Sequence, residues 1–61
     1  MANLTNKELM AIEDQLNSEK LLIKKYKAYA TMCSDPQIRT KFENYASEHQ
    51  NHYNILLNQL S

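Results

Sequence analysis

The chain has 61 residues, and seven Lys and Arg balance seven Asp and Glu, so its formal charge at pH 7 is zero. A neutral chain of this length forms one small domain and lacks the basic excess typical of nucleic-acid-binding proteins. The single cysteine, Cys33, excludes an internal disulfide framework, and no apolar run is long enough to predict a membrane span.

The first predicted helix begins after Thr5, because Thr5 and Glu8 have the S/T-x-x-E spacing of a capping box. The chain contains no glycine, and its one proline is Pro36. Only the stretch Cys33-Ser34-Asp35-Pro36 has the residues of a turn. A helix is therefore expected over about residues 6–33. The N-terminus shows no basic segment followed by an apolar run, so synthesis in the cytoplasm without a secretion signal is expected.

The second predicted helix begins at Pro36, which suits the first position of a helix. Its N-cap is Asp35, or Ser34 with Gln37 closing a capping box. The helix runs over about residues 36–59, leaving a turn at 34–35. Because so short a connection forces neighbouring helices to lie antiparallel, residues 1–61 are predicted to form a single all-α helical hairpin domain.

Both predicted helices carry apolar rows at heptad spacing. The row of the first helix is Leu9, Ile12, Leu16, Glu19, Ile23, Tyr26, Ala30 and Cys33, and that of the second is Ile38, Phe42, Tyr45, His49, His52 and Leu56. Further apolar residues widen both rows beyond what two helices can cover. The sequence therefore predicts a homodimer, in which two hairpins form a four-helix bundle.

Three polar residues interrupt the middle of these rows, namely Glu19, His49 and His52. With the turn centred between Ser34 and Asp35, Glu19 lies level with position 50, between the two histidines. Spacing of three residues places both imidazoles on one face of the second helix. Burial of such groups without partners is costly, so the three side chains are expected to meet at the centre of the bundle.

Three interpretations of this cluster stay open from the residues alone. In the first, Glu19, His49 and His52 bind a divalent transition metal, Zn, Fe, Cu or Ni, and Glu48 orients the imidazole of His52 from four residues away. In the second, the cluster is a metal-free polar network that fixes the register of the helices. In the third, the dimer is offset and the histidines contact solvent.

Signatures of catalysis are few. The sequence contains no nucleophile paired with a base and no glycine-rich phosphate loop. Cys33 ends the first apolar row, where it is either a small buried hydrophobe or, if the dimer brings the two turns together, part of an interchain disulfide. These features favour a protein that is not an enzyme.

The sequence resembles small, clostridial-type members of the spore coat protein F family. The resemblance lies in residues 4–26, the Asp35-Pro36 turn and the segment His49-Gln50-Asn51-His52-Tyr53. It implies a structural or interaction protein of a spore-forming bacterium, located in the spore coat, with other coat proteins as partners.

A more remote resemblance is to ferritin-like di-iron proteins such as rubrerythrin. Their spacing of a ligand Glu followed by Tyr and Ala matches Glu19, Tyr26 and Ala30, and His52 matches their second-helix ligand His. His49 stands where that family has Glu. The resemblance implies an alternative function as a ferritin-like metal-binding or redox protein that uses Glu19, His49 and His52. Because His49 replaces a carboxylate ligand, the oxidase activity of that family is not carried over to this chain.

Overall fold

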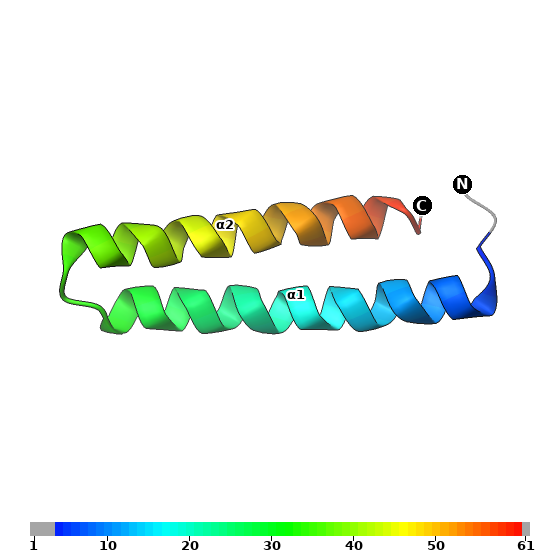
Figure 1. Ribbon diagram of the computed structural model, residues 1–61, viewed down its shortest axis with the longest axis horizontal. Helices are drawn as coiled ribbons and strands as arrows, with labels where there is room; N and C mark the ends of the chain where they lie inside the picture. Colours follow the sequence, from blue (N-terminus) through cyan, green and yellow to red (C-terminus); the bar gives the residue numbers. More distant parts are fainter. Residues whose placement is uncertain (1–3, 61) are drawn as a thin grey trace.

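The computed structural model describes residues 4–60 and consists of two antiparallel helices, α1 (Asn6–Met32) and α2 (Pro36–Asn58), joined at one end (Figure 1). The rod measures 46 × 15 × 11 Å. This confirms the predicted all-α helical hairpin. Over the described residues, neither helix is long and apolar enough to cross a membrane.

Helix α1 begins with the capping box that the sequence predicts. The Thr5 hydroxyl accepts a hydrogen bond from the Glu8 amide at 3.1 Å, and the Glu8 carboxylate accepts one from the Thr5 amide at 3.0 Å. Hydrogen bonding to the Thr5 backbone lowers the pKa of Glu8. The helix ends at Met32, because Cys33 has an extended backbone, with φ −85° and ψ 125°.

The connection occupies residues 33–35 and is held by side chains at both of its ends. The Asp35 carboxylate accepts hydrogen bonds from the amides of Gln37 at 2.8 Å and Ile38 at 3.2 Å, so Asp35, rather than Ser34, is the N-cap of α2. The Arg39 guanidinium donates to the Cys33 carbonyl through Nη2 at 2.7 Å and Nε at 3.1 Å. This contact ties the first turn of α2 to the end of α1.

Small residues let the two helices approach closely. Among the described residues, the buried hydrophobic side chains are Leu16, Ala30 and Ala46, and Ala46 is the most buried at 4% exposure. The line of contact between the helices, termed the seam, therefore runs through Ala46. The heptad pattern places Ala46 beside the apolar row of the second helix rather than within it. Tyr45, which the pattern places within the row, is 42% exposed, and its ring packs against that of Tyr26 with centroids 5.4 Å apart.

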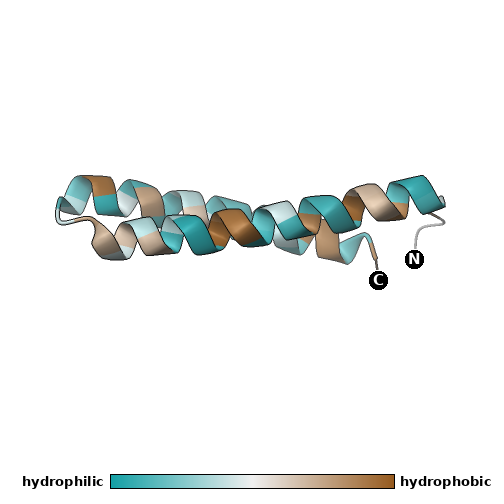
Figure 2. Ribbon diagram, turned by 90° about the horizontal axis from the view of Figure 1, so that it is seen from below, coloured by the Kyte–Doolittle hydropathy of each residue, from teal (hydrophilic) through white to brown (hydrophobic). Residues whose placement is uncertain are grey.

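Many large apolar side chains lie outside this narrow seam. Hydrophobic segments recur along both helices, between hydrophilic ones (Figure 2). Those with exposed side chains are Leu9, Met10, Leu21, Tyr29, Met32, Ile38, Tyr45, Ile55 and Leu57. A single hairpin thus leaves much of its apolar surface in contact with water. The homodimer stays a prediction.

Candidate metal centre

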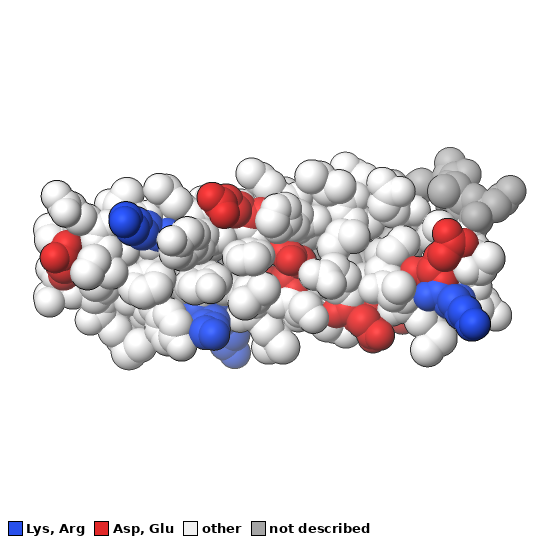
Figure 3. Space-filling view, viewed as in Figure 1, with Lys and Arg blue, Asp and Glu red and all other residues white. Residues whose placement is uncertain are grey.

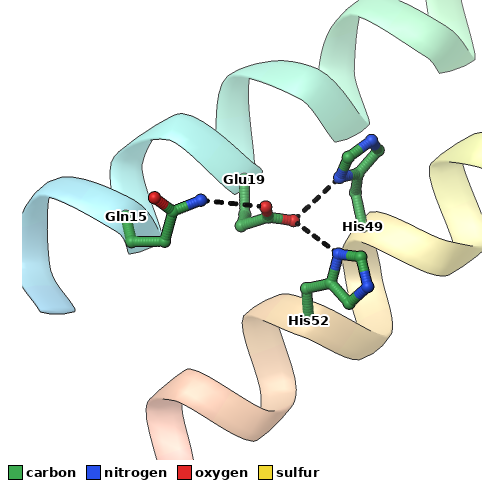
Figure 4. Close-up of polar contacts among 4 residues, drawn as sticks. All are labelled: Gln15, Glu19, His49 and His52. Carbon is green, nitrogen blue, oxygen red and sulfur yellow. Dashed lines mark hydrogen bonds and ion pairs between the residues drawn. The ribbon is translucent and has the colours of Figure 1, made fainter.

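Glu19 is the central residue of α1 and points toward α2 (Figure 4). It is 5% exposed and is the one charged residue among the described residues that is buried. A buried carboxylate is costly unless its oxygens are hydrogen-bonded or bind a cation. The groups that contact its two oxygens therefore determine how this burial is tolerated.

Both histidines approach the same oxygen of Glu19. The Nδ1 atom of His49 lies 2.9 Å from Glu19 Oε2, and the Nδ1 atom of His52 lies 3.4 Å from it (Figure 4). The histidines stand about one helical turn apart on α2, so their rings converge from successive turns. The structure thus brings together the three side chains that the sequence predicts as metal ligands. Whether they bind a metal stays a prediction.

The second oxygen of the carboxylate is also engaged. The side-chain amide of Gln15 donates to Glu19 Oε1 at 3.1 Å. Sequence reasoning missed this residue, although a glutamine four residues before a buried glutamate is a recognisable helical pair. Gln15 fixes the orientation of the carboxylate and leaves Oε2 for the histidines.

Within the described residues, no hydrogen bond joins Glu48 to His52, so the predicted orienting role of Glu48 stays a prediction.

Opposing effects act on the Glu19 carboxyl. Burial raises its pKa, whereas the hydrogen bonds from His49 and Gln15, and the charges of the two imidazoles, lower it. The lowering effects prevail, so the pKa of Glu19 lies below its ordinary value. At neutral pH the group is therefore a carboxylate, the form that can bind a cation.

The shared oxygen determines where the imidazole protons lie. A carboxylate only accepts hydrogen bonds, so the Nδ1 atom of His49 must carry a hydrogen when it bonds to Glu19, whereas the Nδ1 atom of His52 makes an ion-pair contact at 3.4 Å. In that state the Nδ1 atom of His49 has no lone pair for a metal. A metal would take the place of this hydrogen, so one cluster supports either a proton-bridged network or a metal centre.

The spacing of the ligand atoms suits a transition metal. One ligand atom each from Glu19, His49 and His52 lie within 4.8 Å of one another. Two atoms that each lie about 2.0–2.1 Å from an ion are roughly 2.9 Å apart at a right angle and roughly 3.4 Å apart at the tetrahedral angle. The distances of 2.9 and 3.4 Å to Oε2 match these values. Two of the three distances between ligand atoms thus fall in the range that a bound ion requires.

An aromatic ring covers one side of the cluster, and an open depression lies on the other side. The Tyr26 ring stacks on the His49 ring, with centroids 5.7 Å apart and planes inclined by 7°. Next to Glu19 and His52 lies an open depression of about 320 Å³, which Ile55 helps to line. The side chain of His52 is 55% exposed, against 23% for His49. The depression leaves room for further ligands to a bound ion.

Comparison with known proteins gives one match. The family model described as the Coat F domain matches residues 7–60, which is all of the chain except the first six residues and the last. No curated protein and no solved structure shows a significant match. The remote ferritin-like resemblance therefore stays a prediction.

Proposed function

Since the chain belongs to the Coat F domain family, we propose that it is a small structural or interaction protein of the bacterial spore coat that also binds a divalent metal ion. The match over nearly the whole chain is the observation that supports the coat assignment. The hairpin suits a structural role, because a rod 46 Å long offers extended faces to neighbouring molecules.

The coat assignment is tested by following a tagged copy through growth and sporulation. The protein should appear during sporulation and should fractionate with the coat of purified spores. A cytoplasmic spore protein, tagged in the same way, serves as the control for contamination of the coat fraction. Equal expression in growing cells, with none in spores, would contradict the assignment.

The metal-binding part of the proposal rests on the convergence of Glu19, His49 and His52 within 4.8 Å. Two imidazoles and one carboxylate suit zinc, iron, copper and nickel, whereas Mg²⁺ and Ca²⁺ prefer sets made of oxygen atoms. Three protein ligands leave at least one coordination position for a water molecule or another ligand. The centre would stabilise the middle of the rod and anchor a ligand there.

Metal analysis of the natively purified protein tests this part directly. We expect a first-row transition metal in the wild type and its loss in His52→Leu. Titration with Co(II) should give the visible spectrum of a site with nitrogen and oxygen ligands. Cys33→Ala is the matched control and should leave that spectrum unchanged. A spectrum that depends on Cys33, or metal content equal in wild type and His52→Leu, would reject the site.

A further inference from the structure

One long side of the hairpin combines the central cluster with aromatic and aliphatic side chains that a single chain leaves uncovered. This side is termed the cluster face and consists of Glu19, Tyr26, Tyr29, Tyr45, His52 and Ile55. Ring contacts connect its members, because the Tyr26 centroid lies 6.2 Å from that of Tyr29 and 5.4 Å from that of Tyr45. Tyr29 is 39% exposed and Ile55 is 60% exposed.

The two long sides of the hairpin differ in charge. Lys20, Lys24 and Lys27 line an open groove together with Gln50, away from the cluster. On the side shown in Figure 3, charged side chains are few and are scattered, mostly toward the edges. A surface with few charged side chains and several exposed apolar ones is typical of a surface that packs against another protein.

One edge of the cluster face carries opposite charges in positions where two copies of the face would complement each other. The ammonium group of Lys25 lies 5.7 Å from the centroid of the Tyr29 ring and 5.9 Å from that of Tyr26, which places it at the edge of this face. Asp14 precedes Lys25 by about three helical turns and so lies along the same edge. Glu19 stands nearly midway between them.

We propose that two copies of the chain pair through their cluster faces, antiparallel, about a two-fold axis that passes through the level of Glu19. In this arrangement Asp14 of each copy lies level with Lys25 of the other, so the interface gains two opposite-charge pairs. In a parallel pair, α1 of each copy would lie over α2 of the other, so Asp14 and Lys25 would stand on opposite edges of the interface and neither pair would form. At this edge the charge pattern therefore favours the antiparallel pair.

Pairing in this way also completes the metal centre. Each chain supplies three ligand atoms, and the axis brings the carboxylate and two imidazoles of the second copy to the same level. His52, the more exposed ligand, lies on the contacting surface. This completion rests on the metal binding proposed above, whereas the pairing itself rests on the surface and its charges.

Orientation is tested by a distance between spin labels. Ser34→Cys in a Cys33→Ala background places one label at the exposed turn of each copy. At about 1.5 Å per residue along α1, antiparallel copies set the two labels on the order of 40 Å apart. Parallel copies, with helices spaced about 8–10 Å, bring them within about 20 Å. A short distance, or a monomer in light scattering at micromolar concentration, overturns the proposal.

Charge reversal tests the interface residue by residue. Asp14→Lys and Lys25→Asp should each raise the dimer dissociation constant by about tenfold, and the double reversal should restore it. Lys24→Asp, next to Lys25 in sequence but on the groove side, is the matched control and should leave the constant unchanged. Equal effects of Lys24→Asp and Lys25→Asp, or a double reversal weaker than either single variant, would contradict the pairing.

The same measurements in EDTA and in Zn(II) separate the two proposals. An antiparallel dimer that binds no metal supports the pairing and rejects the metal centre. A monomer that binds Zn(II) through His52 supports the metal centre and rejects the pairing.

Discussion

At the scale of single residues, the sequence shows which groups meet but not how they meet. Glu19, His49 and His52 stand out as polar residues in apolar rows, and helical geometry sets them at one level. The sharing of Oε2 by both Nδ1 atoms depends on side-chain rotamers that a heptad pattern does not encode. Gln15 was missed because an exposed glutamine is ordinary until its partner is known to be buried.

Removing the Glu19 carboxylate should destabilise the metal-free protein. Glu19→Ala leaves the Nδ1 hydrogen of half-buried His49 without its acceptor, which costs about 1–3 kcal/mol of unfolding free energy. His52 contributes less, since its exposed ring can bond to water. Chemical denaturation in EDTA measures the loss. Glu48→Ala is the control and should change stability by less than about 0.5 kcal/mol; equal losses in the two variants would contradict the network.

Acid should weaken the fold through the same residue. The folded pKa of Glu19 is lowered below that of an unfolded glutamate, about 4.3, so its contribution to stability is present above that pH. The contribution is lost as pH falls through the lowered folded pKa. Denaturation between neutral pH and pH 3 should therefore show a shallower acid dependence in Glu19→Gln than in the wild type. Parallel curves for the two proteins would show that the carboxylate is not stabilised by folding.

At the scale of the elements, the starts of both helices could be predicted more completely than their ends. The capping box at Thr5 and the Asp35-Pro36 pair are local signals that operate within one turn. The end of α1 has no such signal. It lies at Met32, where the extended Cys33 follows, and the Cys33 carbonyl accepts hydrogen bonds from the Arg39 guanidinium, six residues further along the chain.

The Arg39 contact should stabilise the turn. Arg39→Ala removes two hydrogen bonds to one carbonyl and should lower the free energy of unfolding by about 1 kcal/mol, with water replacing part of the loss at this exposed site. Arg39→Lys should recover only part, because an ammonium group lacks the planar fork. Lys41→Ala, also an exposed change in the first half of α2, is the reference. If Arg39→Ala were no less stable than Lys41→Ala, the turn would not depend on this guanidinium.

At the scale of the whole molecule, the hairpin follows from two periodic helices and one short turn, so its architecture is predictable from the sequence. The breadth of the apolar rows likewise indicates a surface that needs covering. The path of the seam is predictable on α1, where the buried residues Leu16, Glu19 and Ala30 all belong to the heptad row. On α2 it is less so, because Ala46 rather than Tyr45 is buried. That shift leaves Tyr45 on the cluster face.

Pairing should make folding depend on concentration. Full burial of a large apolar side chain stabilises by about 1.5–3 kcal/mol, and these partly exposed side chains each forgo a part of that in a single hairpin, so folding and association are expected to be linked. The Tm should therefore rise as protein concentration is raised about a hundredfold. Tyr45→Lys should lower the Tm most at low concentration, whereas Gln50→Lys on the groove side should not. A Tm independent of concentration would indicate that the hairpin folds alone.

The most direct test of the central cluster is a set of thermal melts of the wild type and of the triple variant Glu19→Leu, His49→Leu, His52→Leu, each in EDTA and in Zn(II). At about 100 times Kd, an ion that binds only the folded state adds about 2.7 kcal/mol, which for a domain of this size is a rise in Tm of roughly 10–20 °C. We predict this rise for the wild type and none for the triple variant. A wild-type Tm unmoved by Zn(II), Fe(II), Cu(II) or Ni(II), with a triple variant at least as stable in EDTA, would contradict the metal centre and leave a polar network without one.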